Sequence, residues 1–158
     1  MKKGAFLLMI LCFLACNNNM LFKADKEITN TWHTDSVLIF QFSVSDTNAT
    51  FYSEINIRHT TDYSYKNLFV FIHNTNPSGK MVTDTVECVL ADKTGKWKGR
   101  GVGDILDFTK MYNDSIFFET SGEYKIEIEQ AMRYGELPKI EMLKGIVSIG
   151  VSIRRRGE

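Results

Sequence analysis

FYSEINIRH, residues 51–59, is the stretch of the chain that decides the fold class. Apolar side chains recur in it at alternate positions, with Phe51, Ile55 and Ile57 on one face and polar side chains on the other. Successive side chains of a β-strand point to opposite faces, so this spacing predicts a strand with one buried face. Such strands are typical of antiparallel sheets that are covered on one side.

Similar segments occur on both sides of this stretch. The predicted strands are 37–44, 51–59, 68–72, 83–90, 122–130 and 146–154. Clusters of Asp, Asn, Ser, Thr and Gly separate them and favour turns. Only residues 129–143 leave room for one or two helical turns, which Pro138 limits. The segment 68–72 is apolar throughout and is expected to be central or covered on both faces, whereas the others are half apolar. Some seven or eight strands of this kind predict an all-β fold: an antiparallel two-sheet β-sandwich, immunoglobulin-like or jelly-roll-like.

Composition fits one globular domain. The chain has 158 residues, of which 44% are hydrophobic, and it contains only two prolines. A chain of this size buries roughly two-thirds of its unfolded surface, so it needs neither disulfides nor a metal to fold. The formal net charge of zero argues against a large attraction to nucleic acid, and no nucleic-acid partner is predicted.

The N-terminal segment has the pattern of an export signal. Lys2 and Lys3 precede an apolar run over 4–14, and the tetrapeptide Phe-Leu-Ala-Cys ends it at Cys16. About 20 apolar residues are needed to cross a bilayer, so this run is too short to span one. We therefore predict a bacterial lipoprotein signal with Cys16 as the lipidated residue. The alternative is an ordinary signal cut after Ala15, which leaves Cys16 as a free thiol.

These boundaries predict three parts. They are a lipoprotein signal peptide over 1–15, a lipidated tether over 16–30 and the β-sandwich domain over 31–158. Bacterial lipoproteins usually carry three acyl chains, palmitate among them, on this cysteine. One acyl chain holds a protein at a membrane only marginally, whereas several hold it stably.

The segment GKWKGRGVGD, residues 95–104, is the most unusual in the chain. Its glycines match neither a phosphate-binding loop nor a dinucleotide-binding fingerprint. Alternate glycines suit a bulged or closely approached strand. The other interpretation is a patch in which Trp97, Lys96, Lys98 and Arg100 bind a glycan or a partner protein.

A second aromatic cluster lies at 63–67, between two predicted strands. Tyr63 and Tyr65 either contact a partner, since aromatic residues are enriched at protein interfaces, or cap the sandwich. Both interpretations remain open at the level of sequence.

No catalytic or metal-binding constellation emerges from the sequence. His33, His59 and His73 lie in separate segments without a second metal ligand nearby, which favours surface or strand-end histidines. Cys88 falls on the apolar face of its predicted strand, so we expect a buried thiol. No catalytic residue, metal or cofactor is predicted, and the chain is not expected to be an enzyme.

The mature chain resembles the gliding-motility lipoprotein family GldH of the Bacteroidetes. The motifs that carry the resemblance are Trp32, Tyr63-Ser64-Tyr65-Lys66-Asn67-Leu68, Asp84-Thr85, Leu90-Ala91-Asp92, 95–101, Gly103-Asp104, Gly122-Glu123-Tyr124, 129–133, 143–146 and Ile149-Gly150. Ser64 departs from the proline expected between the two tyrosines. The resemblance implies a lipid-anchored accessory protein of the envelope machinery for gliding, which overlaps with type IX secretion, and no catalytic residues carry over.

Partners and location follow from the same resemblance. We expect envelope protein partners and a membrane anchor. Because no acidic residues follow Cys16 directly, we expect the anchor to face the periplasm. A carbohydrate-binding β-sandwich lipoprotein is the alternative, since a sandwich fold by itself does not exclude glycan binding.

Three short motifs resemble the Asp-Ser/Thr-apolar acceptor of O-glycosylation in exported Bacteroidetes proteins. Their acceptor residues are Ser36, Thr85 and Ser115. The competing explanation is that an Asp followed by a hydroxyl residue commonly leads from a turn into a strand.

Overall fold

The computed structural model describes residues 19–29, 31–136 and 138–157, and these residues contain strands but no helix. The signal peptide and Cys16 lie outside them. In chain order the strands are β1 (Met20–Glu27), β2 (Thr31–His33), β3 (Leu38–Val44), β4 (Thr50–Thr60), β5 (Asn67–Thr75), β6 (Met81–Val89), β7 (Arg100–Val102), β8 (Ile105–Phe117), β9 (Gly122–Gln130), β10 (Met142–Lys144) and β11 (Ile146–Arg155). The described part of the chain accordingly offers no helix able to cross a membrane.

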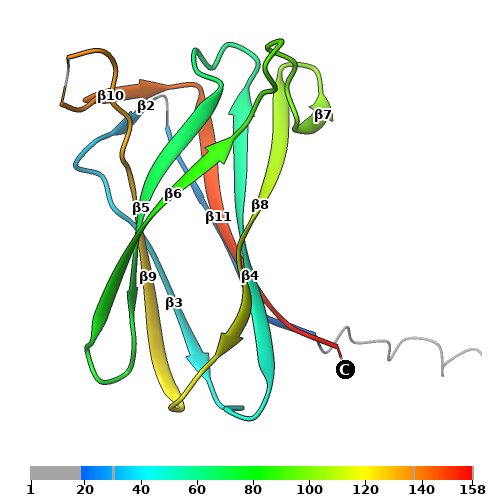
Figure 1. Ribbon diagram of the computed structural model, residues 1–158, viewed down its shortest axis with the longest axis vertical. Coiled ribbons are helices and arrows are strands. Elements are labelled where there is room, and N and C mark those ends of the chain that lie inside the picture. The colour runs from blue at the N-terminus through cyan, green and yellow to red at the C-terminus, as the bar shows by residue number, and fades with distance from the viewer. Residues whose placement is uncertain (1–18, 30, 137, 158) are drawn as a thin grey trace, which may run out of the picture.

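Two antiparallel sheets form a sandwich (Figure 1). One sheet has five strands in the order β1-β11-β4-β8-β7, and the other has four in the order β3-β9-β5-β6. The short strands β10 and β2 pair at one end of the sandwich. The fold class predicted from the sequence, a single antiparallel β-sandwich, is confirmed.

Side-chain alternation places the core between the two sheets. In β4 the odd-numbered residues from Phe51 to His59 are buried, whereas the residues between them are more exposed. β3 and β5 alternate in the same way on the opposite sheet. Since each strand has a single apolar face, both sheets bury that face against the other. The largest fully buried side chains are Trp32, Phe40, Ile55, Ile57, Leu68, Ile72, Leu90, Ile128, Leu143, Ile146, Ile149 and Ile153.

β11 differs from the other strands because both of its faces are covered. Its inner face carries Ile149, Val151 and Ile153, and its outer face carries small residues that are also buried, Ser148 and Ser152. β11 lies between β1 and β4, and the longer side chains of these two strands rise on either side of it. The centre of the sheet is therefore lower than its flanks.

The domain boundary predicted at residue 31 is wrong. Met20–Glu27 fall within the predicted tether, yet they form β1 and pair with β11 from end to end. The sandwich therefore begins near Met20 rather than at residue 31. No helical turn occurs in the described part of 129–143, because β9 runs to Gln130 and an irregular segment follows it.

One long strand was not predicted at all. β8 pairs with β4 over most of its length, although Asp107 and the polar run Asn113-Asp114-Ser115 interrupt its apolar pattern. The register shifts around Ser53 in β4 accommodate this irregularity.

Candidate functional site

The outer face of the five-stranded sheet carries a hollow lined mainly by polar side chains. Cross-strand register brings them into three rows across β1, β11, β4 and β8: Glu27, Ser148, Arg58 and Asp107; Asp25, Gly150, Asn56 and Thr109; and Lys23, Ser152, Glu54 and Met111. We call the first two rows, together with Lys23, the polar groove. Its volume is about 350 Å³.

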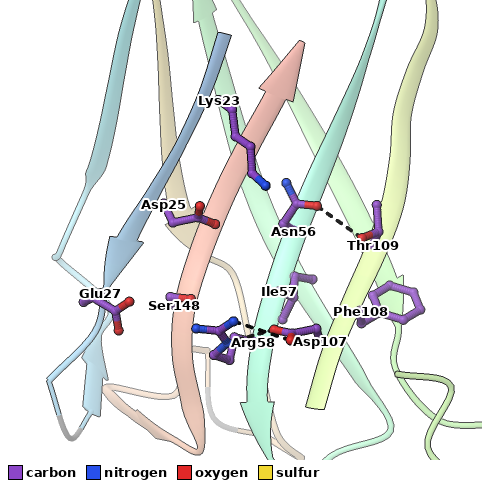
Figure 2. A pocket seen from close by; sticks show the side chains of 10 residues that line it. All are labelled: Lys23, Asp25, Glu27, Asn56, Ile57, Arg58, Asp107, Phe108, Thr109 and Ser148. Carbon is purple, nitrogen blue, oxygen red and sulfur yellow. Dashed lines mark hydrogen bonds and ion pairs between the residues drawn. The ribbon is translucent and has the colours of Figure 1, made fainter. Parts of the chain in front are cut away.

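The floor of the polar groove is β11. Figure 2 shows Ser148 on β11 between the carboxylates of Asp25 and Glu27 on one side and Arg58 on the other. A Cβ atom at Gly150 would collide with the carboxylate of Asp25, so glycine at this position lets Asp25 lie over the strand. Small residues in the central strand thus create the hollow, and charged residues of the neighbouring strands form its walls.

Hydrogen bonds link the walls to the floor. Thr109 Oγ1 donates to Asn56 Oδ1 at 3.1 Å, and Asn56 Nδ2 donates to Ser152 Oγ at 3.3 Å. Ser152 Oγ in turn donates to Glu54 Oε2 at 3.3 Å. This chain of contacts joins β8, β4 and β11 across the sheet, and it holds the side chains of Asn56 and Thr109 in place.

Arg58 and Asp107 form the principal ion pair of the groove. Arg58 Nε donates to Asp107 Oδ1 at 2.8 Å, and Nη2 donates to Oδ2 at 3.4 Å. This hydrogen bond and the charge of Asp107 raise the pKa of the Arg58 guanidinium further. Both side chains are about half exposed, so the pair is available to a ligand that approaches the sheet.

The polar groove can recognise a polar partner through hydrogen bonds and charge. It presents two carboxylates on β1, a guanidinium and an amide on β4, and a hydroxyl on β8. Sequence reasoning missed this site, because its residues come from four segments far apart in the chain. The one available signal was the alternation of Ser148, Gly150 and Ser152 on the face of residues 146–154 opposite the apolar one.

The two predicted aromatic sites form one cluster at an end of the sandwich. We call His59, Tyr63, Tyr65, Trp97 and Tyr134 the aromatic cap. The rings of His59 and Trp97 lie 4.8 Å apart between centroids, and those of Tyr63 and Tyr65 lie 5.6 Å apart. Tyr65 extends the cluster to Tyr134 at 6.2 Å. The sequence had suggested these aromatic segments separately, and the fold brings them together.

The residues of the aromatic cap differ in how far they are buried. Tyr63 is 3% exposed and its hydroxyl donates to the carbonyl of Asn67 at 2.9 Å, which supports the capping interpretation for this residue. Tyr65 and Trp97 are half-buried. Tyr63 therefore cannot offer its ring to a partner while the fold is intact, whereas parts of Tyr65 and Trp97 remain accessible.

The basic residues predicted beside Trp97 are exposed. Lys96 and Lys98 flank Trp97 in a loop, and Arg100 begins β7. Gly99 and Gly101 are closely approached by β8, as predicted, whereas Gly103 lies in a turn with a positive φ and open space around it. Gly101 packs against β8, where an added Cβ would collide with the carbonyl oxygen of Ile105.

His59 and Cys88 are buried. His59 lies near the end of β4, as expected of a strand-end histidine, but it is fully buried rather than at the surface. Burial lowers the pKa of its imidazole. Burial also raises the pKa of the Cys88 thiol to about 11, and this residue is fully buried as predicted. Among the described residues, no cluster of three His, Cys, Asp or Glu side chains is arranged to hold a metal ion.

The three predicted O-glycosylation acceptors are all exposed. Ser36 lies in the loop before β3, Thr85 lies in β6 and Ser115 lies in β8.

Comparison with known protein families identifies the family of this chain. The GldH lipoprotein family matches residues 20–153. This chain belongs to the GldH lipoprotein family. The match begins at β1 and ends in β11, so the family and the sandwich cover the same residues.

Two curated relatives agree with this assignment over nearly their whole length. A gliding motility lipoprotein GldH homolog of Christiangramia forsetii is 34% identical, and the alignment covers 95% of this chain and 93% of the relative. The gliding motility lipoprotein GldH of Flavobacterium johnsoniae is 32% identical, with coverage of 98% and 97%.

Likeness to solved structures is weak. The infectious bursal disease virus VP2 subviral particle gives a TM-score of 0.37 at 12% identity, over 84% of this GldH-family chain and 30% of the VP2 chain. The domain CBM35 from Cellvibrio japonicus Abf62 gives 0.27 at 11% identity, over 90% and 94%. At these TM-scores neither likeness bears on ligands or function.

Proposed function

We propose that this GldH-family chain is a lipid-anchored, non-enzymatic accessory component of the envelope machinery for gliding, which overlaps with type IX secretion. Acyl chains on Cys16, palmitate among them, hold it at the membrane, and the sandwich faces the periplasm. Family membership supports the lipoprotein assignment, and the names of both relatives support a role in gliding.

The observation that carries the proposal is the polar groove. Its charged side chains are exposed, and hydrogen bonds join Arg58 to Asp107 and link Thr109, Asn56 and Ser152 across the sheet. Charged groups arranged in this way give a protein contact its specificity and its association rate more than its affinity. A component that assembles with other envelope proteins needs such a surface.

The environments of the reactive side chains support a non-enzymatic role. The Cys88 thiol is buried in the core and its raised pKa of about 11 keeps it protonated at neutral pH. The His59 imidazole is enclosed in the aromatic cap, where Nδ1 lies 2.9 Å from the carbonyl oxygen of Thr60. Both side chains serve packing in these positions.

Site-specific crosslinking in the native envelope tests the partner surface. A photo-crosslinking amino acid at Thr109 lies in the polar groove, and one at Gln41 lies exposed on β3 of the other sheet as the control. We expect Thr109 to give an adduct with an envelope protein that mass spectrometry identifies as a gliding or type IX component. Monomer alone from Thr109, or the same adduct at equal yield from Gln41, would contradict the proposal.

The anchor is tested by replacing the lipidated sulfur. Cys16→Ala is expected to abolish labelling by a palmitate analogue and to release the protein from membranes, since no acyl chain remains. If the variant stays bound to membranes and the unaltered chain takes up no label, the anchor assignment is wrong.

Carbohydrate binding is the second candidate function. The groove favours it, because amides and carboxylates such as Asn56 and Asp25 can pair with the hydroxyls of a sugar. A glycan array with Asn56→Ala and Trp97→Ala separates the two possible sites. Loss of binding in Asn56→Ala alone assigns the site to the polar groove, and loss in Trp97→Ala alone assigns it to Trp97 and the basic residues beside it. If the unaltered chain binds no glycan, this function is excluded.

O-glycosylation at Ser36, Thr85 and Ser115 forms a separate part of the proposal. Their exposure supports it. The intact mass of the protein from its native host is expected to exceed that of the lipidated polypeptide. A mass equal to the lipidated polypeptide would exclude the modification.

A further inference from the structure

A second cavity enters the core between the two sheets, away from the polar groove. It has a volume of about 350 Å³ and its lining is mostly apolar. The apolar and aromatic residues that line it are Phe42, Val82, Ile116, Phe117, Phe118, Tyr124, Ile126 and Ile153. We call this space the inter-sheet cavity.

The cavity opens because two sheet edges face each other without a covering strand. β7 pairs only with Ile105–Asp107 of β8, so the rest of β8 is an edge, and β6 is the edge of the other sheet. Val82 pairs with Asn74 and therefore points to the inner side of its sheet, yet it is 53% exposed. Phe117, in the last position of β8, is 66% exposed. Large apolar side chains thus surround an open mouth.

A buried polar group lines the interior of the cavity. Ser53 is 1% exposed, and its hydroxyl oxygen has no hydrogen-bond partner among the residues that the structure describes. Buried hydroxyl groups are nearly always hydrogen-bonded, to protein, to water or to a ligand. The Ser53 hydroxyl is therefore free to pair with a water or with a polar atom of a molecule that enters the cavity.

A polar contact joins the two sheets in the lining of the cavity. Tyr112 Oη donates to Asp84 Oδ2 at 2.5 Å and accepts from Asn74 Nδ2 at 2.7 Å. Asp84 is therefore engaged. Lys125 is engaged as well, because its Nζ lies 2.9 Å from Glu127 Oε2. Lys80 takes part in none of the ion pairs among the described residues, and it is the cation left at the mouth for a ligand.

We propose that the inter-sheet cavity binds an amphipathic anion, with its alkyl chain between the sheets and its anionic head at Lys80. Binding pockets for small molecules have this size and this combination of apolar walls with a few polar groups. An apolar cavity of roughly 150 Å³ holds benzene, so this cavity holds an alkyl chain of about a dozen carbon atoms. The Ser53 hydroxyl pairs with a water or an oxygen that enters with the ligand. This inference does not rest on the proposed function.

Titration with dodecanoate tests the proposal. The probe is added to the mature chain carrying Cys16→Ser, so that no acyl chain of its own competes, and binding is followed by calorimetry. We expect one site for dodecanoate and none for butyrate, whose chain is too short to fill the cavity. Vesicles of phosphatidylcholine with phosphatidylglycerol form a second arm, which distinguishes a membrane lipid from a free carboxylate as the source of the alkyl chain.

Substitutions in and around the inter-sheet cavity test whether the ligand binds there. Ser53→Leu fills the cavity and is expected to weaken dodecanoate binding at least tenfold. Val82→Trp narrows the mouth of the cavity. Because Val82 is exposed, this substitution is expected to leave the fold intact, so it tests the proposal even if Ser53→Leu does not fold. Lys80→Gln is expected to weaken binding about two- to fivefold, as for an exposed ion pair. Lys144→Gln, an exposed lysine on β10, is the matched control and is expected to bind as the unaltered chain does.

Each outcome decides for or against the cavity. Dodecanoate binding that both Val82→Trp and Lys80→Gln weaken supports the proposal with a free carboxylate as the ligand. If the chain does not bind dodecanoate but binds vesicles, and both Val82→Trp and Lys80→Gln weaken that binding, the proposal is supported with a membrane lipid as the ligand. Binding that is unchanged in folded Ser53→Leu and Val82→Trp, or no binding in either arm, overturns it.

Discussion

His59 shows how burial converts a titratable side chain into a packing residue with a pH dependence. Its ring contacts Trp97 and Tyr63, and burial lowers the pKa of the imidazole. As the pH falls below about 6.5, the unfolded chain takes up a proton that the folded chain resists, so the free energy of unfolding decreases. The contribution of the neutral His59 side chain to the free energy of unfolding is therefore complete above this pH and decreases as the pH falls below it.

Substitution of His59 is expected to remove this pH dependence. Between pH 7.5 and 5.5, the free energy of unfolding measured by urea denaturation should fall more for the unaltered chain than for His59→Phe, which keeps a ring in the cap. His33→Gln is the control, because His33 is only partly buried. Identical pH profiles for His59→Phe and the unaltered chain would show that another group is responsible.

At the scale of the element, the β7–β8 hairpin depends on Gly101. An added Cβ would collide with the carbonyl oxygen of Ile105 and would lie 3.0 Å from Leu106 Cα, both backbone atoms that have little room to move. Gly101→Ala is therefore expected to lower the free energy of unfolding by about 1–3 kcal/mol. Hydrogen exchange should accelerate at the amides of Ile105–Asp107. Gly157→Ala, with open space around its Cβ, should change neither quantity.

The pairing of β1 with β11 predicts that Met20–Glu27 belong to the folding unit. Deletion of these residues removes the half-buried Phe22 and Ala24 and exposes the edge of β11. We expect the melting temperature to fall by about 10 °C or more and the protein to aggregate through the free edge. Circular dichroism and size-exclusion chromatography measure both. If the deletion leaves both unchanged, this segment is a tether after all.

Strands whose apolar residues alternate cleanly were predicted within one or two residues of their true ends. β9 matches its prediction over Gly122–Gln130, and β4 exceeds its predicted range by one residue at each end. β8 was not predicted because it lies at a sheet edge for much of its length. Polar side chains such as Asp107 and Asn113 are solvated there and interrupt the alternation of apolar residues. β1 was not predicted for the same reason, because it is the edge strand at the other side of the five-stranded sheet.

At the scale of the whole molecule, we expect the charges of the polar groove to contribute to recognition rather than to stability. Arg58 and Asp107 are about half exposed, and exposed ion pairs contribute up to about 1 kcal/mol. Arg58→Ala is therefore expected to leave the free energy of unfolding nearly unchanged while it reduces the crosslink from Thr109 to its partner several-fold.

Arg155→Ala provides the matched control for this prediction. Arg155 pairs with Asp46 at 3.0 Å with similar exposure, and neither residue lines the groove. It should leave the crosslink intact. Equal crosslinking in Arg58→Ala and Arg155→Ala would argue against the groove as the partner surface.

The sequence by itself determined the sandwich class, the positions of the central strands and the burial of Cys88, because these depend on local alternation between apolar and polar side chains. Only the tertiary structure decided that Tyr63 is buried, that Met20–Glu27 form a strand, and that the groove and the inter-sheet cavity exist. These features arise where strands distant in the chain lie side by side. Their residues share a surface through register and sheet packing, which no local pattern encodes.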